Sequence, residues 1–239
     1  MTDHPARLGT TPMTVEWRAR HQTLFLYEVD LDALVPHVPD AVTVQEVRPG
    51  VGLLAIESLH YLPGHFADPR ESVEIVVAVL VEPDLTVQMP VPQFSLFVTS
   101  VLSSSAAFVE HERMLLRTPM EHAPDLRMSY APDGASVAIF EGETPIVECR
   151  NTRAPAVFAP KVMWGLIYSN KQGELHRGAF RWEGNVFEHQ QRGGDVGRLH
   201  PHPVFRGLDV SRVRGCYRQM AAQPDLPTRI AYYHVGRAP

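Results

Sequence analysis

Residues 25–44 read Phe-Leu-Tyr-Glu-Val-Asp-Leu-Asp-Ala-Leu-Val-Pro-His-Val-Pro-Asp-Ala-Val-Thr-Val, and this stretch says most about the fold. Aromatic and β-branched residues predict a strand over Thr23–Val29. Asp30 is a suitable N-cap for a helical turn over Leu31–Val35, which ends there because the residue before a proline disfavours helical backbone. The stretch therefore predicts a strand that passes directly into a short helix and a Pro-rich exit.

Strand patterns dominate the remaining sequence. Val51–Leu59 is rich in strand-forming residues, and Glu71–Glu82 is a nearly continuous apolar run, typical of a strand buried on both faces. Ser103–Arg117 is the best helix candidate, because its serines offer an N-cap, apolar residues recur every three or four positions, and Pro119 ends the pattern. The other expected elements are a meander of strands over 127–130, 136–141 and 146–152, its continuation over 162–168, 175–182 and 185–189, a helix over Arg212–Met220, and a last strand over Thr228–Val235.

This inventory predicts an α+β fold with two or three helices in one continuous domain over residues 15–239. The 21 prolines and 16 glycines are spread along the chain and mark no linker. Residues 1–14 are polar, and we expect them to form an N-terminal arm that becomes ordered only by packing on a neighbour.

Composition excludes several classes of function. The chain has 239 residues, a net charge of -5 and no block of like charges, which disfavours a nucleic-acid partner. The longest strongly apolar run, Ile75–Val81, is too short to span a membrane, and the start shows no secretory signal. Two widely separated cysteines, Cys149 and Cys216, indicate reduced thiols. We therefore expect a soluble cytoplasmic protein.

The stretch from Arg20 to Val44 resembles the start of acetoacetate decarboxylases: it keeps the arginine before the first strand, Tyr27, the Asp-x-Asp-Ala-Leu at Asp30–Leu34 and the following Val-Pro. Arg70-Glu71-Ser72 resembles the family's glutamate-bearing step, and the part from Leu199 to Tyr233 is also similar. The resemblance implies a curved, largely antiparallel sheet that closes like a cone around an apolar cavity, in a homo-oligomer. It carries over Arg20 as the active-site cation and Glu71 as the acidic residue.

The family's signature lysine is missing. Aligning the helix on Pro119 places Met114 and Leu115 where the family has paired lysines, and neither side chain forms an imine. The chain contains only two lysines. Lys171 lies in a solvated turn, whereas Lys161 precedes an apolar strand, so it is either a surface strand end or a relocated imine-forming residue.

The lysine-free helix carries other reactive residues. The resemblance implies that either His111 or Arg113 faces the cavity, where histidine moves protons and arginine holds an anionic oxygen. Alternatively, the charged residues simply form the wet face of an amphipathic helix. The expected catalytic residues are thus Arg20, Glu71, His111 and Arg113, with substrate contacts from Tyr27, Met114, Leu115 and Arg117.

Metal and cofactor motifs are weak. His200-Pro201-His202, with His60, His65 or His189, offers imidazoles, but an isolated His-x-His pair is a poor metal signal and we expect no metal. The sequence lacks the Gly-x-Ser-x-Gly elbow, the Gly-x-Gly-x-x-Gly loop and the Walker loop, which disfavours serine-hydrolase, nicotinamide and nucleotide chemistry. We expect no organic cofactor.

The leading hypothesis is an enzyme that acts on a small oxo-acid or polyketide-like carbonyl compound by acid–base chemistry and oxyanion stabilisation. Cyclisation, dehydration, isomerisation or a lysine-free decarboxylation would fit, which makes it a lyase, isomerase or cyclase. Two alternatives stay open. One is a small-molecule binding protein without catalysis, and the other is a Schiff-base enzyme that uses Lys161.

Overall fold

The computed structural model describes residues 6–9, 11–64, 68–90, 94–115, 118–131, 135–152, 157–171 and 173–237. The strands are β1 (Ala6–Leu8), β2 (Met13–Trp17), β3 (Ala19–Asp30), β4 (Val51–Tyr61), β5 (Ser72–Val81), β6 (Phe94–Ser103), β7 (Met120–His122), β8 (Leu126–Tyr130), β9 (Ser136–Glu141), β10 (Thr144–Arg150), β11 (Ala159–Lys171), β12 (Glu174–Gln190), β13 (Val196–Leu199), β14 (Val213–Ala222) and β15 (Thr228–Arg237). The helices are α1 (Leu31–Leu34) and α2 (Ala106–Leu115), with 3-10 turns at Val35–His37, Pro203–Phe205 and Val210–Arg212.

Seven strands close into a barrel in the order β12, β11, β6, β5, β4, β3 and β14. Neighbouring strands are antiparallel except β6 and β11, which run parallel. The long strand β12 completes the ring, because Gly178–Glu183 pair with β15 and Val186–Gln190 pair with β14. Gly184 lies between the two pairings, where a Cβ would come within 2.7 Å of the Trp182 ring. A closed barrel is thus the expected cone-like sheet.

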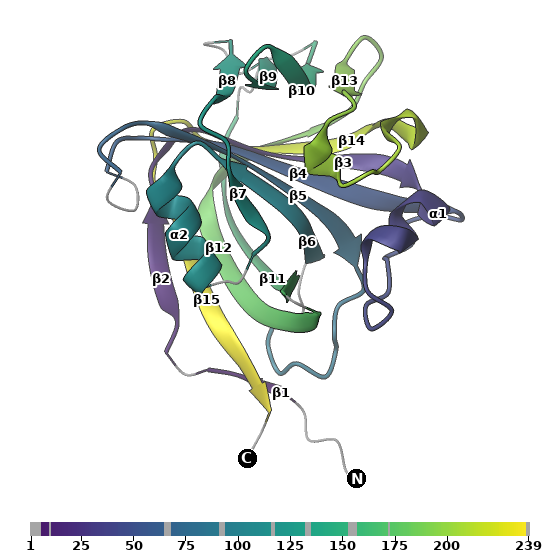
Figure 1. Cartoon of the computed structure of the whole chain (residues 1–239), viewed down its shortest axis with the longest axis vertical. Coiled ribbons are helices and arrows are strands. Elements are labelled where there is room, and N and C mark those ends of the chain that lie inside the picture. The colour runs from purple at the N-terminus through teal and green to yellow at the C-terminus, as the bar shows by residue number, and fades with distance from the viewer. Residues whose placement is uncertain are drawn as a thin grey trace.

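β15 and three short strands extend the barrel sheet, and four others form a separate sheet. β1 and β2 both pair with β15, and β7 pairs with β6. A four-stranded sheet in the order β13, β10, β9 and β8 lies at the upper end of the barrel in Figure 1, and β1 lies at the opposite end. The segment expected as an N-terminal arm thus supplies β1 and the start of β2 on the chain's own β15.

The barrel wall separates two apolar cores. Successive side chains of a strand point to opposite faces, so Leu53 and Ala55 of β4 face the barrel interior while Leu54 and Ile56 face an outer core. The outer core lies between the barrel and the four-stranded sheet and includes Ile139 and Val147 of that sheet. Burial on both faces explains the nearly continuous apolar runs of β4 and β5.

The sequence prediction was wrong for one long element. Residues 212–220 were expected to be a helix, but β14 covers Val213–Ala222 and pairs with β3 on one side and β12 on the other. Met220 and Ala222 face the interior, whereas Cys216 faces the outer core. Closure of the barrel supplies hydrogen-bond partners on both edges of this strand, which no local pattern records.

Smaller corrections concern helix ends and sheet membership. Asp30 makes no capping hydrogen bond, because its carboxylate pairs with Arg212 and Arg214 instead. α2 begins at Ala106 because Ser103 ends β6, and the Ser105 hydroxyl accepts a hydrogen bond from the backbone N–H of Phe108. The segments expected to continue the meander instead form β11 and the single strand β12 of the barrel. No helix in the described parts of the chain is long and apolar enough to cross a membrane.

Candidate active site inside the barrel

A cavity of about 80 Å³ lies in the barrel interior. Its wall is mainly apolar and aromatic, and among the described residues that line it only one is acidic, Glu57 of β4. Gln22 of β3 and Tyr232 of β15 add an amide and a phenol. The full lining consists of Trp17, Gln22, Leu24, Glu57, Phe94, Leu96, Met163, Ile167, Phe180, Trp182, Val186, Met220, Ala222, Ile230 and Tyr232.

Glu57 is held by a chain of hydrogen bonds at the cavity wall. The Gln22 Nε2 donates to Glu57 Oε1 at 2.9 Å, and the Thr228 hydroxyl donates to Gln22 Oε1 at 3.2 Å. Thr228 thereby fixes the orientation of the amide, so that its N–H group faces the carboxyl. Gln22 and Thr228 are buried, whereas Glu57 keeps partial access to the cavity.

A second group of acids lies one layer behind this wall. Tyr61 of β4 packs edge-on against the wall residue Trp17, and its hydroxyl donates to Glu74 Oε2 at 2.8 Å. Tyr61 also packs edge-on against Phe108 of α2. The next turn of α2 directs Glu112 into the same interior, where it is only 6% exposed.

Burial raises the pKa values of these acids. It raises the pKa of Glu57, an effect that the Gln22 amide partly offsets. Burial also raises the pKa of Glu74 well above its usual value, and the nearby Glu112 and Glu57 raise it further. The pKa of Glu112 rises to about 7 through burial. Burial, and then the three carboxyls, raise the pKa of Tyr232 well above that of a free tyrosine.

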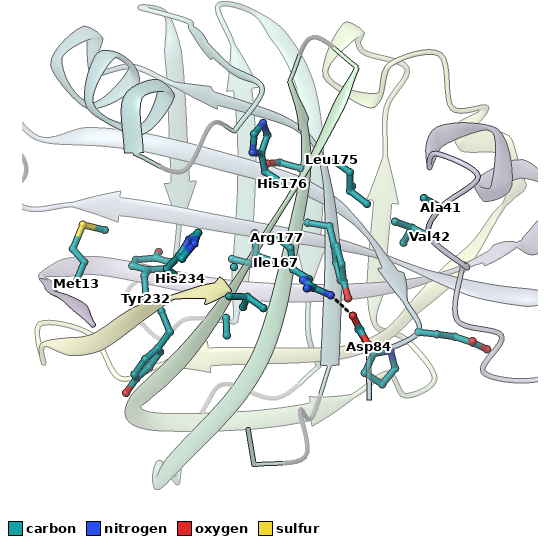
Figure 2. A pocket seen from close by; sticks show the side chains of 18 of the residues that line it. Met13, Ala41, Val42, Asp84, Ile167, Leu175, His176, Arg177, Tyr232 and His234 are labelled. Atoms are coloured by element: carbon teal, nitrogen blue, oxygen red, sulfur yellow. Dashed lines mark hydrogen bonds and ion pairs between the residues drawn. The ribbon is translucent and has the colours of Figure 1, made fainter. Parts of the chain in front are cut away.

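The cavity adjoins a wide groove. The groove has a volume of about 1040 Å³ and lies between the β11–β12 hairpin, β15 and the segments at 41–43 and 82–84. Arg177 and Asp84 form an ion pair in it, and Figure 2 shows this pair close to Ile167. Ile167 and Tyr232 line both the groove and the inner cavity, so the two spaces adjoin at these residues.

The carried-over pair, Arg20 and Glu71, is brought together, but outside the cavity. Arg20 donates to Glu71 Oε1 through Nε at 2.8 Å and through a terminal nitrogen at 2.6 Å. His60 Nε2 lies 3.1 Å from the other oxygen of Glu71, and the Tyr130 hydroxyl lies 3.3 Å from His60 Nδ1. Arg20, Glu71, His60 and Tyr130 form an outer rim cluster. It belongs to the surface, because the side chains of Arg20 and Glu71 are 46% and 36% exposed.

α2 presents a different residue from those expected to face the cavity. His111 is partly exposed, with Nδ1 3.5 Å from Glu112 Oε1, and Arg113 donates to the backbone oxygen of Met120. Glu112 is the inward-facing residue. Arg117 lies outside the described residues, as do the side chains of Met114 and Leu115.

Tyr27 and Lys161 occupy contrasting places. Tyr27 is completely buried in the outer core, away from the cavity. Lys161 forms an ion pair with Glu188, which also binds Arg218, and its Nζ lies 4.0 Å from the sulfur of the wall residue Met220. Lys161 therefore lies beside the cavity wall with its ammonium bound to a carboxylate, and its use in an imine stays a prediction.

The histidine pair at 200 and 202 is split between partners. His200 Nε2 lies 2.8 Å from Glu148, and His202 Nε2 lies 3.1 Å from Glu141. Within the described residues, no group of three metal-ligating side chains is arranged around one point.

Sequence reasoning missed Glu57, Glu74 and Glu112 as a group. A usable signal was present, since Glu57 and Glu74 each interrupt an otherwise apolar strand. An isolated carboxyl in such a run requires either an exposed edge or a special interior environment.

The fold is shared with known enzymes. Over 97% of this chain and 91% of the other, the structure is similar to an acetoacetate decarboxylase, with a TM-score of 0.59 and 14% identity. It is also similar to the enduracididine biosynthesis enzyme MppR in complex with pyruvate, with a TM-score of 0.56 and 10% identity over 95% and 90% of the two chains. An acetoacetate decarboxylase-like enzyme from Sphingomonas wittichii RW1 gives a TM-score of 0.51 at 10% identity over 95% and 92%. No family model and no curated protein matches the sequence.

Proposed function

We propose that this protein is a cofactor-independent enzyme that moves protons on a small carbonyl compound inside the barrel. The observation that carries the proposal is Glu57, a carboxyl that lines an apolar cavity and is oriented by the buried Gln22 amide. Carboxyls with raised pKa values in a cavity are typical of acid–base sites. The fold neighbours support a carbonyl substrate, because one is an acetoacetate decarboxylase and another binds pyruvate.

Glu57 is the residue we assign as the base. Glu57 and Glu74 each accept a hydrogen bond that favours the ionised form. Burial and the neighbouring carboxyls still raise the pKa of Glu74 well above the usual value, whereas the pKa of Glu57 is raised less strongly. Glu57 also lines the cavity, and Glu74 and Glu112 lie behind the wall. We therefore assign Glu74 and Glu112 as positioning residues that limit the charge of the interior.

The chemistry follows from these positions. The Glu57 carboxylate takes a proton from the carbon beside the carbonyl, and the electrons of that C–H bond form a carbon–carbon double bond. Negative charge then develops on the carbonyl oxygen, where the Tyr232 hydroxyl donates a hydrogen bond. In a β,γ-unsaturated ketone, return of the proton to the γ-carbon gives the conjugated isomer. In a β-hydroxy ketone, the proton is transferred to the hydroxyl as the Cβ–O bond breaks, which releases water and leaves a Cα–Cβ double bond. Neither route needs an oxidant or a cofactor.

We further propose that the substrate arrives from the groove and passes between Ile167 and Tyr232. The mostly apolar wall of the cavity then surrounds the reacting carbons and excludes water. In such surroundings, a carboxylate and a phenol interact more strongly with developing charge than they do in water.

Hydrogen exchange tests the proposal without knowledge of the natural substrate. The protein is mixed with acetone, butan-2-one or cyclopentanone in D₂O, and loss of the α-proton signals is followed by NMR. We expect exchange above the buffer rate, and a loss of roughly 10²- to 10⁴-fold in Glu57→Gln, the usual contribution of a positioned base.

Two matched variants serve as controls. Glu110→Gln alters an exposed carboxyl on α2, and Glu71→Gln alters the acid of the outer rim cluster; we expect both to retain exchange. A folded Glu57→Gln protein with the full rate would overturn the proposal. Ketone binding with no exchange would also overturn it, in favour of a binding protein.

A further inference from the structure

The electrostatic character of the barrel interior indicates which carbonyl compounds fit. Glu57, Glu74 and Glu112 approach the interior from β4, β5 and α2, and their charges act on one another and on Tyr232. Of the described residues that line the cavity, none is lysine, arginine or histidine. A carboxylate ligand in this space would lie close to Glu57 without a cation in the wall to pair with it.

Two cationic side chains beside the cavity wall are already bound to one carboxylate. Lys161 and Arg218 bind the two oxygens of Glu188 beside Met220. An anionic ligand would have to draw one of these groups away from Glu188, at the cost of one of the two ion pairs of that carboxylate.

A positively charged ligand fits the hydrogen-bonding groups less well than a neutral carbonyl. The carboxyls of Glu57 and Glu74 already accept hydrogen bonds from neutral donors, the Gln22 amide and the Tyr61 hydroxyl. The Trp17 indole N–H, at the cavity wall, is buried without a partner among the described residues. A carbonyl oxygen can accept a hydrogen bond from this indole N–H, which an ammonium group cannot do.

We infer that the cavity selects carbonyl compounds that are uncharged at the reacting end, such as ketones, enones and esters, and that it disfavours oxo-acids. This inference rests on the proposed function in naming the same cavity as the reaction site. It separates this protein from a fold neighbour that binds the oxo-acid pyruvate.

Binding of a matched pair of ligands tests the inference. Methyl acetoacetate and acetoacetate share one carbon skeleton, but only the second carries a carboxylate, and n-butylamine serves as a cation. Two of the protein's three tryptophans, Trp17 and Trp182, line the cavity, so their fluorescence reports occupancy. At pH 7 we expect methyl acetoacetate to bind at least about tenfold more tightly than either charged ligand, which corresponds to a difference of about 1.4 kcal/mol in binding free energy.

Glu57→Gln should narrow the difference between the ester and the acid, because it removes the nearest negative charge, whereas Glu110→Gln should leave it unchanged. Equal or tighter binding of acetoacetate would overturn the inference, and its loss in Lys161→Met would identify the anchoring cation. Tighter binding of n-butylamine would overturn the inference as well.

Selective binding of the ester with no hydrogen exchange would overturn the proposed function but support this inference. Hydrogen exchange of acetoacetate that depends on Glu57 would support the proposed function but overturn this inference.

Discussion

Glu71 and Glu74 are three residues apart in the chain, yet they occupy opposite environments. Glu71 belongs to the outer rim cluster, where the hydrogen bonds from Arg20 hold its pKa below the usual value. Glu74 lies in the barrel interior, where burial raises its pKa well above the usual value. The comparison shows that the surroundings of a carboxyl decide whether its charged or its neutral form is favoured.

The largest difference between the two regions should appear in packing. Phe108→Ala removes a ring that is 2% exposed and packs against Tyr61 in the interior, so we expect a loss of about 3–5 kcal/mol in the free energy of unfolding. Tyr130→Ala removes a partly exposed ring that stacks on His21 beside the rim, and we expect a loss of about 1 kcal/mol. Urea unfolding of both variants measures the difference. Equal losses would show that the rim is as tightly packed as the interior.

The two regions should also respond to pH in opposite directions. The pKa of Glu112 is about 7 in the folded protein and 4.5 in the unfolded chain, so between these two pH values the folded state holds a proton that the unfolded chain has lost. The stability that Glu112 contributes therefore falls as pH rises through that window. Glu57 and Glu74 act in the same direction, with Tyr61, Tyr232 and His111 as their neighbours. Glu71 has a lowered pKa, so its contribution is present above pH 4.5 and is lost on acidification.

Glu112→Gln tests this prediction. Urea unfolding between pH 4.5 and 7.5 should show wild type losing roughly 3 kcal/mol from the Glu112 site alone, and the variant should lack that part of the slope. Glu110→Gln, on the exposed face of the same helix, should follow wild type. An unchanged slope in Glu112→Gln would mean that the interior carboxyl titrates normally.

The sequence predicted the strands of the barrel wall better than it predicted the interior. Local patterns predict β3, β4 and β5, because these strands carry apolar side chains on both faces. They also predict the short helix after β3, which ends close to a proline. β14 was missed because its partners, β3 and β12, are distant in sequence or defined only by closure of the ring. The resemblance favoured Glu71, but the closed barrel places Glu71 at the surface and Glu74 in the interior.

The proposed passage between the groove and the cavity predicts an effect of intermediate size. Ile167→Trp should obstruct the passage and slow ketone exchange roughly ten- to a hundredfold, in the range that steric changes in a pocket produce. Val162→Trp, on the same strand at a position 44% exposed, is the matched control and should keep the wild-type rate. Ile167→Ala should admit bulkier ketones. If Ile167→Trp exchanges ketones as fast as wild type, the substrate reaches the interior by another route.

The smallest effect is expected at the outer rim cluster. Arg20→Gln removes both hydrogen bonds to Glu71, but the two side chains are 46% and 36% exposed, and ion pairs this exposed contribute little in water. We expect a free energy of unfolding close to that of wild type, with any difference shrinking as salt screens the pair. Ketone exchange should be unchanged, because Arg20 does not line the cavity. Loss of exchange in a folded Arg20→Gln protein would move the chemistry from Glu57 to the rim, since only an arginine in contact with the reacting oxygen would have so large an effect on the rate while leaving stability unaltered.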